Sequence, residues 1–154
     1  MANWFECKVK YVRMLETGMQ KAVNEPYLVD ALSFTEAESR ITEEMAPFIS
    51  GEFTVSAVKR EKLSEVFYDE TGDKWYKVKY NIITVDEKTA VEKKTSVTTL
   101  VQAANFQAAL DNFMEGMKGT MADFEVASIS ETPIMDVYRE DLSGGKPAET
   151  TAEG

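Results

Sequence analysis

The stretch Trp4-Phe5-Glu6-Cys7-Lys8-Val9 returns 71 positions later as Trp75-Tyr76-Lys77-Val78-Lys79-Tyr80. The same offset relates residues 53–67 to residues 124–138, and an offset of 72 relates residues 28–34 to residues 100–106. Three blocks therefore agree in order and in spacing, which favours an internal duplication over chance similarity between amphipathic segments.

Hydrophobic periodicity predicts the same elements in each repeat. In the first repeat we expect strands at 3–14, 20–32, 52–60 and 64–68 and a helix at 33–46; in the second, strands at 73–85, 90–103, 123–130 and 135–139 and a helix at 105–119. The predicted fold is α+β, an internal duplication of a strand–strand–helix–strand unit that forms antiparallel sheet with two packed helices.

The domain organisation follows from the repeat. We expect one duplicated domain over residues 1–141, with repeat units at about 3–70 and 74–140 that share sheet and core. The turn at 69–73 is predicted to join them as a tight hairpin. Residues 142–154 combine Gly-Gly, Pro, small and acidic residues, which predicts a disordered acidic tail.

Helix caps and core positions are also predicted. Ser33 and Asn105 are N-cap residues, and Glu36 stands where a capping box needs an acid. Helical and alternating spacing assigns these side chains to the core: Phe34, Ile41, Phe53, Val55, Phe106, Leu110, Phe113, Phe124 and Val126.

The composition limits the compartment and the chemistry. Cys7 is the only cysteine, and we see neither a signal peptide nor a long apolar run, so we expect a cytoplasmic protein that does not enter membranes. The chain has no histidine, and the spacing places Cys7 in the core rather than in a nucleophile's setting. We therefore expect a non-catalytic protein with no cofactor and no metal.

The charges are distributed unevenly along the chain. The formal net charge is -10, and residues 33–52 carry five acids against one base. Residues 74–94, by contrast, carry six lysines against three acids. Basic charge thus lies on predicted strands, whereas acidic charge lies on a predicted helix and on the tail.

One constellation combines aromatic and basic side chains. Strand alternation places Trp4 and Trp75 on the face away from the core, together with Lys8, Lys10, Lys77 and Lys79. Exposed rings that stack on bases and ammonium groups that meet phosphates are typical of single-stranded nucleic-acid binding. The alternative is that the tryptophans cover a sheet edge or pack against a helix, and that the lysines are solvated surface residues without a binding role.

Two functions remain open on these observations. The first is binding of single-stranded DNA or RNA through the tryptophan–lysine face. The alternative is a protein–protein adaptor or inhibitor that uses acidic helices and an exposed sheet, which suits the negative net charge. A duplicated chain can be a monomeric pseudo-dimer or can form a homodimer.

Three longer strings carry a family resemblance: residues 4–9, 25–38 and 49–59. They resemble a family of uncharacterised proteins of Bacteroidetes and their phages, a domain of unknown function, over roughly residues 3–140. The resemblance implies a host or phage cytoplasmic protein and supplies no catalytic residues. Separately, the order strand, strand, strand, strand, helix over residues 53–119 is similar to the repeats of Whirly and transcriptional-coactivator-type single-strand binders.

Overall fold

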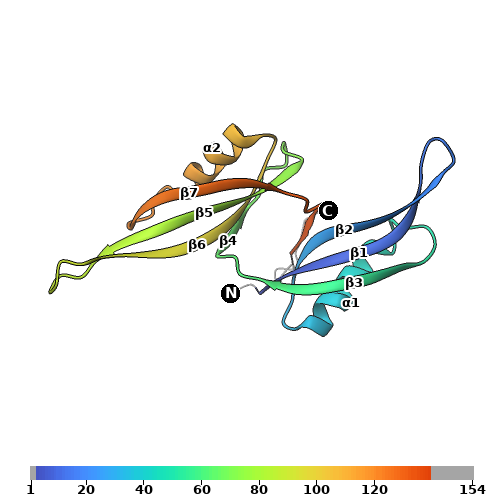
Figure 1. Ribbon diagram of the computed structural model, residues 1–154, viewed down its shortest axis with the longest axis horizontal. Helices are drawn as coiled ribbons and strands as arrows, with labels where there is room; N and C mark the ends of the chain where they lie inside the picture. The colour runs from blue at the N-terminus through green and yellow to red at the C-terminus, as the bar shows by residue number, and fades with distance from the viewer. Residues whose placement is uncertain (1–2, 140–154) are drawn as a thin grey trace. The chain divides into compact units, whose positions relative to one another are not determined.

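Two long β-hairpins, each followed by a helix, organise the chain in the computed structural model, which describes residues 3–139 (Figure 1). The first half contains β1 (Trp4–Met14), β2 (Gln20–Asp30), α1 (Phe34–Met45), β3 (Phe53–Glu61) and β4 (Glu65–Phe67). The second contains β5 (Lys74–Val85), β6 (Glu92–Ala103), α2 (Phe106–Gly116), β7 (Asp123–Thr132) and β8 (Val137–Tyr138). The fold is therefore α+β, and its element order repeats as the sequence predicts.

Local chemistry explains where the helices begin. The Ser33 hydroxyl accepts a hydrogen bond from the Glu36 amide at 3.1 Å, and the Asn105 side chain accepts one from the Ala108 amide at 2.9 Å. The Glu36 carboxylate in turn accepts a hydrogen bond from the Leu32 amide. Both predicted N-caps are confirmed, because each satisfies an amide that has no partner within its helix.

The strands form two four-stranded sheets rather than one. Their orders are β3-β1-β2-β8 and β4-β6-β5-β7. The expectation of one sheet common to both repeats is wrong, because each long hairpin lies in a sheet of its own. The hairpin predicted at 69–73 is wrong too, because β4 pairs with β6 and not with β5. Turn-forming residues mark a reversal of the chain, but they do not say which strand the returning chain joins.

The two repeats exchange their last strands. β4 belongs to the first repeat but pairs in parallel with β6 of the second, placing Val66 opposite Leu100. β8 belongs to the second repeat but pairs in parallel with β2 of the first, placing Val137 opposite Leu28. Within the described residues, unit 1 therefore comprises 3–61 and 136–139, and unit 2 comprises 62–135.

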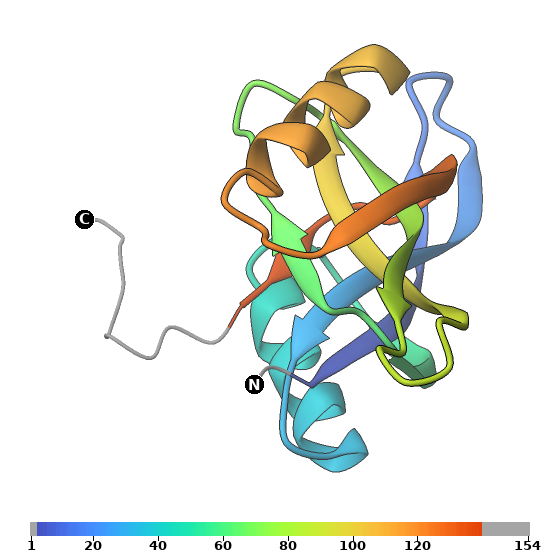
Figure 2. The ribbon, with the colours of Figure 1, turned by 90° about the vertical axis from the view of Figure 1, so that its left-hand side faces the viewer.

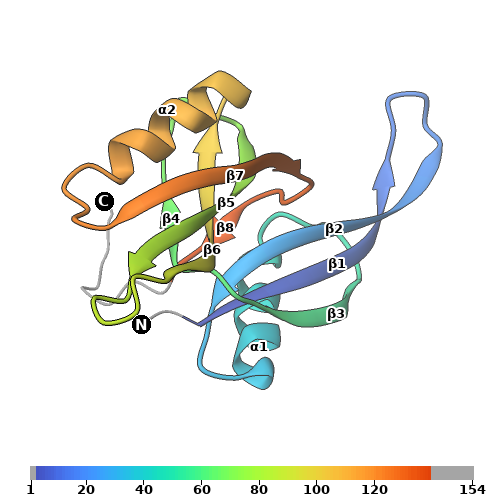
Figure 3. The ribbon, with the colours of Figure 1, turned by 60° about the vertical axis from the view of Figure 1, so that its left-hand side comes forward.

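In unit 1, α1 covers one face of the sheet (Figure 3). Ala37, Ile41 and Met45 point from the helix onto Phe5, Cys7 and Val9 of β1, in the core. Phe34 was expected in this core but is 51% exposed, and its ring meets the Phe5 ring edge-on. It stands at the first position of the helix, and its side chain is only partly covered there.

In unit 2, α2 lies across the corresponding sheet face (Figure 2). Phe113 is fully buried among Val78, Tyr80 and Val101. Phe106, the counterpart of Phe34, is 55% exposed, so this core assignment is wrong for the same reason. Val126 is also exposed. The other expected core residues are half-buried or buried: Ile41, Phe53, Val55, Leu110, Phe113 and Phe124.

Two further sequence predictions concern membranes and the tail. None of the helices among residues 3–139 is long and apolar enough to span a membrane. The predicted tail, residues 142–154, lies outside the described residues.

Candidate functional site

Both tryptophans are buried. Trp4 is 4% exposed and Trp75 is 2% exposed, so the expectation that their rings form open stacking platforms is wrong. In unit 2, the Tyr68 ring packs edge-on against Trp75 with 5.8 Å between centroids. Alternation placed both indoles correctly on the face opposite the helix, but alternation does not say what covers that face.

The predicted lysines lie in rows of small neutral side chains. On β1, Lys8 stands between Ala57 and Pro26, and Lys10 stands between Thr54 and Asn24. Lys8, Lys10 and Lys79 are exposed and form no ion pair within residues 3–139. Lys77 is half-buried and does have an interaction partner. The structure thus leaves three of the four predicted lysines open, without exposed rings beside them.

A buried carboxylate organises the distal part of the β1–β2 hairpin. Glu25 accepts hydrogen bonds from the Tyr11 hydroxyl at 2.8 Å and the Tyr27 hydroxyl at 3.2 Å, and it pairs with Arg13. Burial, together with the nearby Glu25 charge, raises the pKa of Tyr27, so this hydroxyl remains a donor. Sequence reasoning missed this group, although an acid facing the predicted core stripe was a signal for it.

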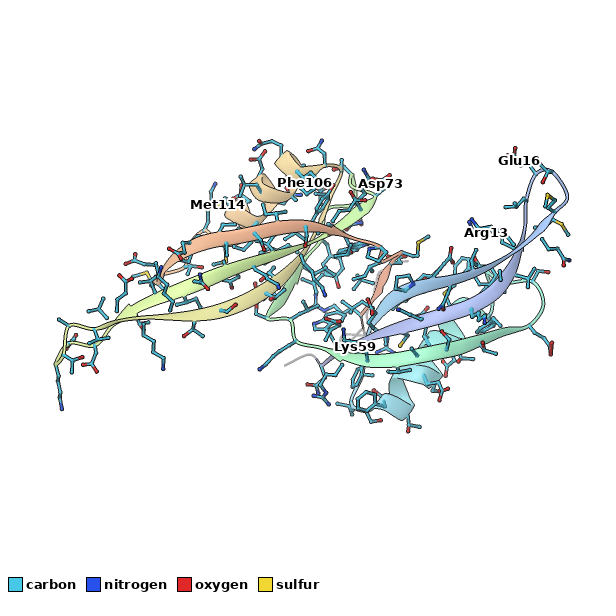
Figure 4. All side chains as sticks on the ribbon, in the orientation of Figure 1. Arg13, Glu16, Lys59, Asp73, Phe106 and Met114 are labelled. Atoms are coloured by element: carbon cyan, nitrogen blue, oxygen red, sulfur yellow. The ribbon has the colours of Figure 1, made fainter. Side chains whose placement is uncertain are left out.

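A groove of about 650 Å³ lies at the same end of unit 1. One wall is the end of β1, residues 11–14, and the other is the segment 48–52 that follows α1. Arg13 lies on this hairpin and Glu16 at its tip (Figure 4). Since Arg13 is paired with Glu25, the wall formed by the end of β1 carries no unbalanced positive charge.

Exposed apolar side chains gather around the groove. Phe48, one of its lining residues, is 75% exposed. Val12 and Met14 line the groove as well, and Leu15 and Met19 are exposed farther along the same hairpin. Contiguous exposed apolar surface marks interaction sites, and methionine adapts its shape to different partners. These five residues form the apolar rim.

Acidic side chains flank the groove on the helix side. A second hollow shares Gly51 and Glu52 with the groove and is also lined by Glu38 of α1. Neither Glu38 nor Glu52 forms an ion pair with any described residue. The site therefore presents apolar surface next to uncompensated negative charge.

The corresponding end of unit 2 combines an ion pair and a hydrogen-bonded turn with exposed apolar side chains. Glu125 of β7 pairs there with Lys94 at 3.1 Å and accepts a hydrogen bond from Asn81 at 3.1 Å. The β5–β6 turn is organised by the Asp86 carboxylate, which accepts hydrogen bonds from the Lys88 and Thr89 amides. Val85 and Val91 of the β5–β6 hairpin and Met121 after α2 are also exposed, so both ends share apolar surface, and unit 2 differs in its ion pair and its turn.

Comparison with known proteins places the chain in a family. Residues 3–140 match the family described as a domain of unknown function, DUF4494. The chain belongs to the DUF4494 family. Neither the curated proteins nor the solved structures contain a match. The DUF4494 match spans both repeats and both units, including the exchanged strands β4 and β8.

The DUF4494 chain keeps its single thiol in the core, as the sequence predicts. Cys7 is fully buried beneath α1, and burial raises the pKa of its thiol to about 12. A thiol with so high a pKa is almost entirely protonated at neutral pH and is a poor nucleophile.

Proposed function

We propose that the chain is a non-catalytic protein-binding module and that the groove of unit 1 receives its partner. The observation that carries this proposal is the apolar rim: three of its residues, Val12, Met14 and Phe48, line a groove of about 650 Å³, and the other two are exposed on the same hairpin. Burial of the tryptophans removes the aromatic surface that would have favoured nucleic acid instead.

The size of the apolar rim is suited to a binding site. Burying one large apolar side chain contributes about 1.5–3 kcal/mol, and association costs an estimated 4–15 kcal/mol. Several rim residues must therefore be covered together to give useful affinity. Phe48 is the natural anchor, because aromatic side chains at the centre of an interface contribute most to binding.

Site-specific photo-crosslinking tests the proposal. A benzophenone side chain at Met14 is expected to crosslink a protein in an extract of the cells that produce the chain. The adduct should disappear when Phe48→Ser is added. The same probe at Phe106, which is similarly exposed in unit 2, is the matched control. Equal labelling from both positions, or labelling unaffected by Phe48→Ser, would rule the groove out.

A second candidate function is single-stranded nucleic-acid binding through the lysine rows of the sheet. The observation that favours it is that Lys8 and Lys10 face solvent among neutral neighbours and form no ion pair within residues 3–139. Ammonium groups that are not neutralised by nearby acids remain available to phosphates. Lys79, between Ser128 and Thr98, gives unit 2 a similar feature.

Anisotropy of a fluorescent 20-nucleotide poly(dT) at low salt tests this second candidate. Binding should weaken steeply with added salt and should be lost in the double variant Lys8→Glu, Lys10→Glu, with Lys88→Glu as control. Indole fluorescence should not change, since neither ring is open to a base. Absence of binding by the parent chain at low salt would eliminate this function.

We also propose that the chain works in the cytoplasm of Bacteroidetes or of cells infected by their phages. The family resemblance supports the source, and a lone buried thiol is compatible with a reducing compartment. Fractionation of producing cells tests the location, and recovery of the chain outside the cytoplasm would contradict it.

A further inference from the structure

Resting on the proposed function, we infer that the partner enters the groove as an extended strand with basic and apolar residues in alternation. The strand adds to the open edge of β1 at Val12 and Met14. The inference joins three observations on unit 1: an unpaired strand edge, a groove along that edge, and different chemistry on its two sides.

The open edge is created where β3 stops short. The β1–β3 ladder begins at Trp4 and ends where Tyr11 meets Phe53, whereas β1 continues to Met14. The Asn3 carbonyl accepts a hydrogen bond from Ala31, so odd-numbered residues of β1 direct their backbone groups toward β2. The amides and carbonyls of Val12 and Met14 therefore point to the unpaired side, where an added strand would find them.

The groove follows this edge. Its wall at residues 11–14 is the unpaired strand end, and its opposite wall at residues 48–52 keeps a gap beside it. A volume of about 650 Å³ lies within the usual range for ligand sites, about 300–1,000 Å³. A short extended segment can thus continue the line of β3 without moving the scaffold.

The two faces of β1 dictate what the added strand must carry. Side chains of a strand alternate between faces, so one set would meet Val12 and Met14 on the face away from α1. The other set would lie on the helix side, near Glu52, which lines the groove, while Glu38 adds negative charge in the adjoining hollow. The first set should be apolar, and the second should be Lys or Arg.

The charge of the groove also selects against the chain's own C-terminus. Residues 140–154 contain four acids and one lysine. Such a segment would be repelled by Glu38 and Glu52, which have no cationic partner among the described residues. A basic partner strand would instead be attracted by these carboxylates.

Synthetic hexapeptides test the inference on the full chain. The probe is acetyl-Lys-Val-Lys-Ile-Lys-Val-amide with a fluorophore, compared with two versions that carry N-methyl groups on the amides of one strand edge or of the other. Anisotropy should show at least about a tenfold loss of affinity for one N-methylated version and little change for the other, because only one edge pairs with β1. Backbone NMR shifts should centre on Val12 and Met14.

Charge variants complete the test. Glu52→Lys should weaken the basic peptide several-fold at low salt, whereas Glu87→Lys in the β5–β6 turn of unit 2 should not. Equal affinity for both N-methylated peptides and the parent peptide would overturn strand addition. If the three peptides bind equally but the Met14 crosslink still forms, the protein-binding function stands and only the proposal of strand addition is wrong. If Phe48→Ser leaves both crosslink and peptide binding intact, both proposals fail.

Discussion

Gly72 is held where no side chain fits. A Cβ built at this position would lie 2.4 Å from the backbone of Ala103, far inside van der Waals contact. The turn is fixed there by Gln102, which donates to the Gly72 carbonyl and accepts from the Asp69 amide. Backbone and side-chain hydrogen bonds on both sides of Gly72 leave the turn no room to withdraw.

We predict that Gly72→Ala destabilises unit 2 by about 1–3 kcal/mol, the usual cost of overpacking. Urea unfolding followed by circular dichroism measures the change. Glu70→Ala, on the exposed side of the same turn, is the control and should have little effect. An unchanged midpoint for Gly72→Ala would show that β6 and the turn can separate at low cost.

The thiol of Cys7 gives a second prediction at this scale. Its pKa of about 12 arises mainly from burial, with repulsion from Glu6 and Glu38 adding to it. Iodoacetamide at pH 8 should therefore label the unfolded chain rapidly and the native chain only as fast as it opens. Rapid labelling without denaturant would place the thiol at the surface and contradict the core of unit 1.

The tryptophans show how far single residues can be predicted from sequence. Alternation identified the sheet face on which Trp4 and Trp75 lie, because the direction of a strand side chain depends only on local backbone geometry. Exposure depends on which segments lie over that face, and no periodicity records this. The apolar rim was missed for a related reason. Met14 and Met19 stand at a strand end and in a turn, where the sequence pattern does not predict whether a side chain is buried or exposed.

Among the elements, β8 is the smallest and is held by few contacts. The Leu28 amide donates to the Asp136 carbonyl at 3.0 Å, and the Tyr138 ring stacks on Tyr27 at 6.0 Å between centroids. Asp136 and Glu44 of α1 both have a raised pKa, chiefly because they are desolvated. For Glu44 the nearby Arg40 partly offsets this effect, while Glu43 and Asp136 reinforce it.

These two carboxyls predict a stability that falls as pH rises. A raised pKa means that the folded state binds the proton more tightly, so unfolding releases protons and the free energy of unfolding decreases above about pH 4. The double variant Glu44→Gln, Asp136→Asn should flatten that decrease in thermal melts. Asp69 and Glu125 have lowered pKa values, so they contribute stability that is lost as the pH falls below about 4. A variant with the parent's pH profile would contradict the assignment.

At the element scale the sequence predicted the long strands and both helices but not the exchange of β4 and β8. Long strands carry several cycles of alternation, and the caps at Ser33 and Asn105 fix the helix starts. β4 has three residues and β8 has two, too few for any pattern to indicate a partner. Their parallel pairing is set by which edge the chain reaches, and only the folded arrangement shows that.

The reciprocal exchange has a consequence for the whole molecule. Each sheet is completed by a strand from the other repeat, with Val66 opposite Leu100 in one and Val137 opposite Leu28 in the other. If unit 2 unfolds, β8 becomes the end of a long flexible segment, and the entropic cost of closing it onto β2 rises. Unfolding of either unit should therefore weaken the other.

We predict that Phe113→Ala, deep in the core of unit 2, also lowers the stability of unit 1. The substitution removes a fully buried ring that contacts Phe67, Tyr80 and Phe124, at a local cost of about 3–5 kcal/mol. Native-state hydrogen exchange should then show faster exchange of the Leu28 amide in unit 1, which donates to the Asp136 carbonyl. Phe106→Ser, at an exposed ring of the same helix, is the control and should leave that amide unchanged. Two separate unfolding transitions, with Phe113→Ala shifting only one, would show that the exchanged strands do not couple the units.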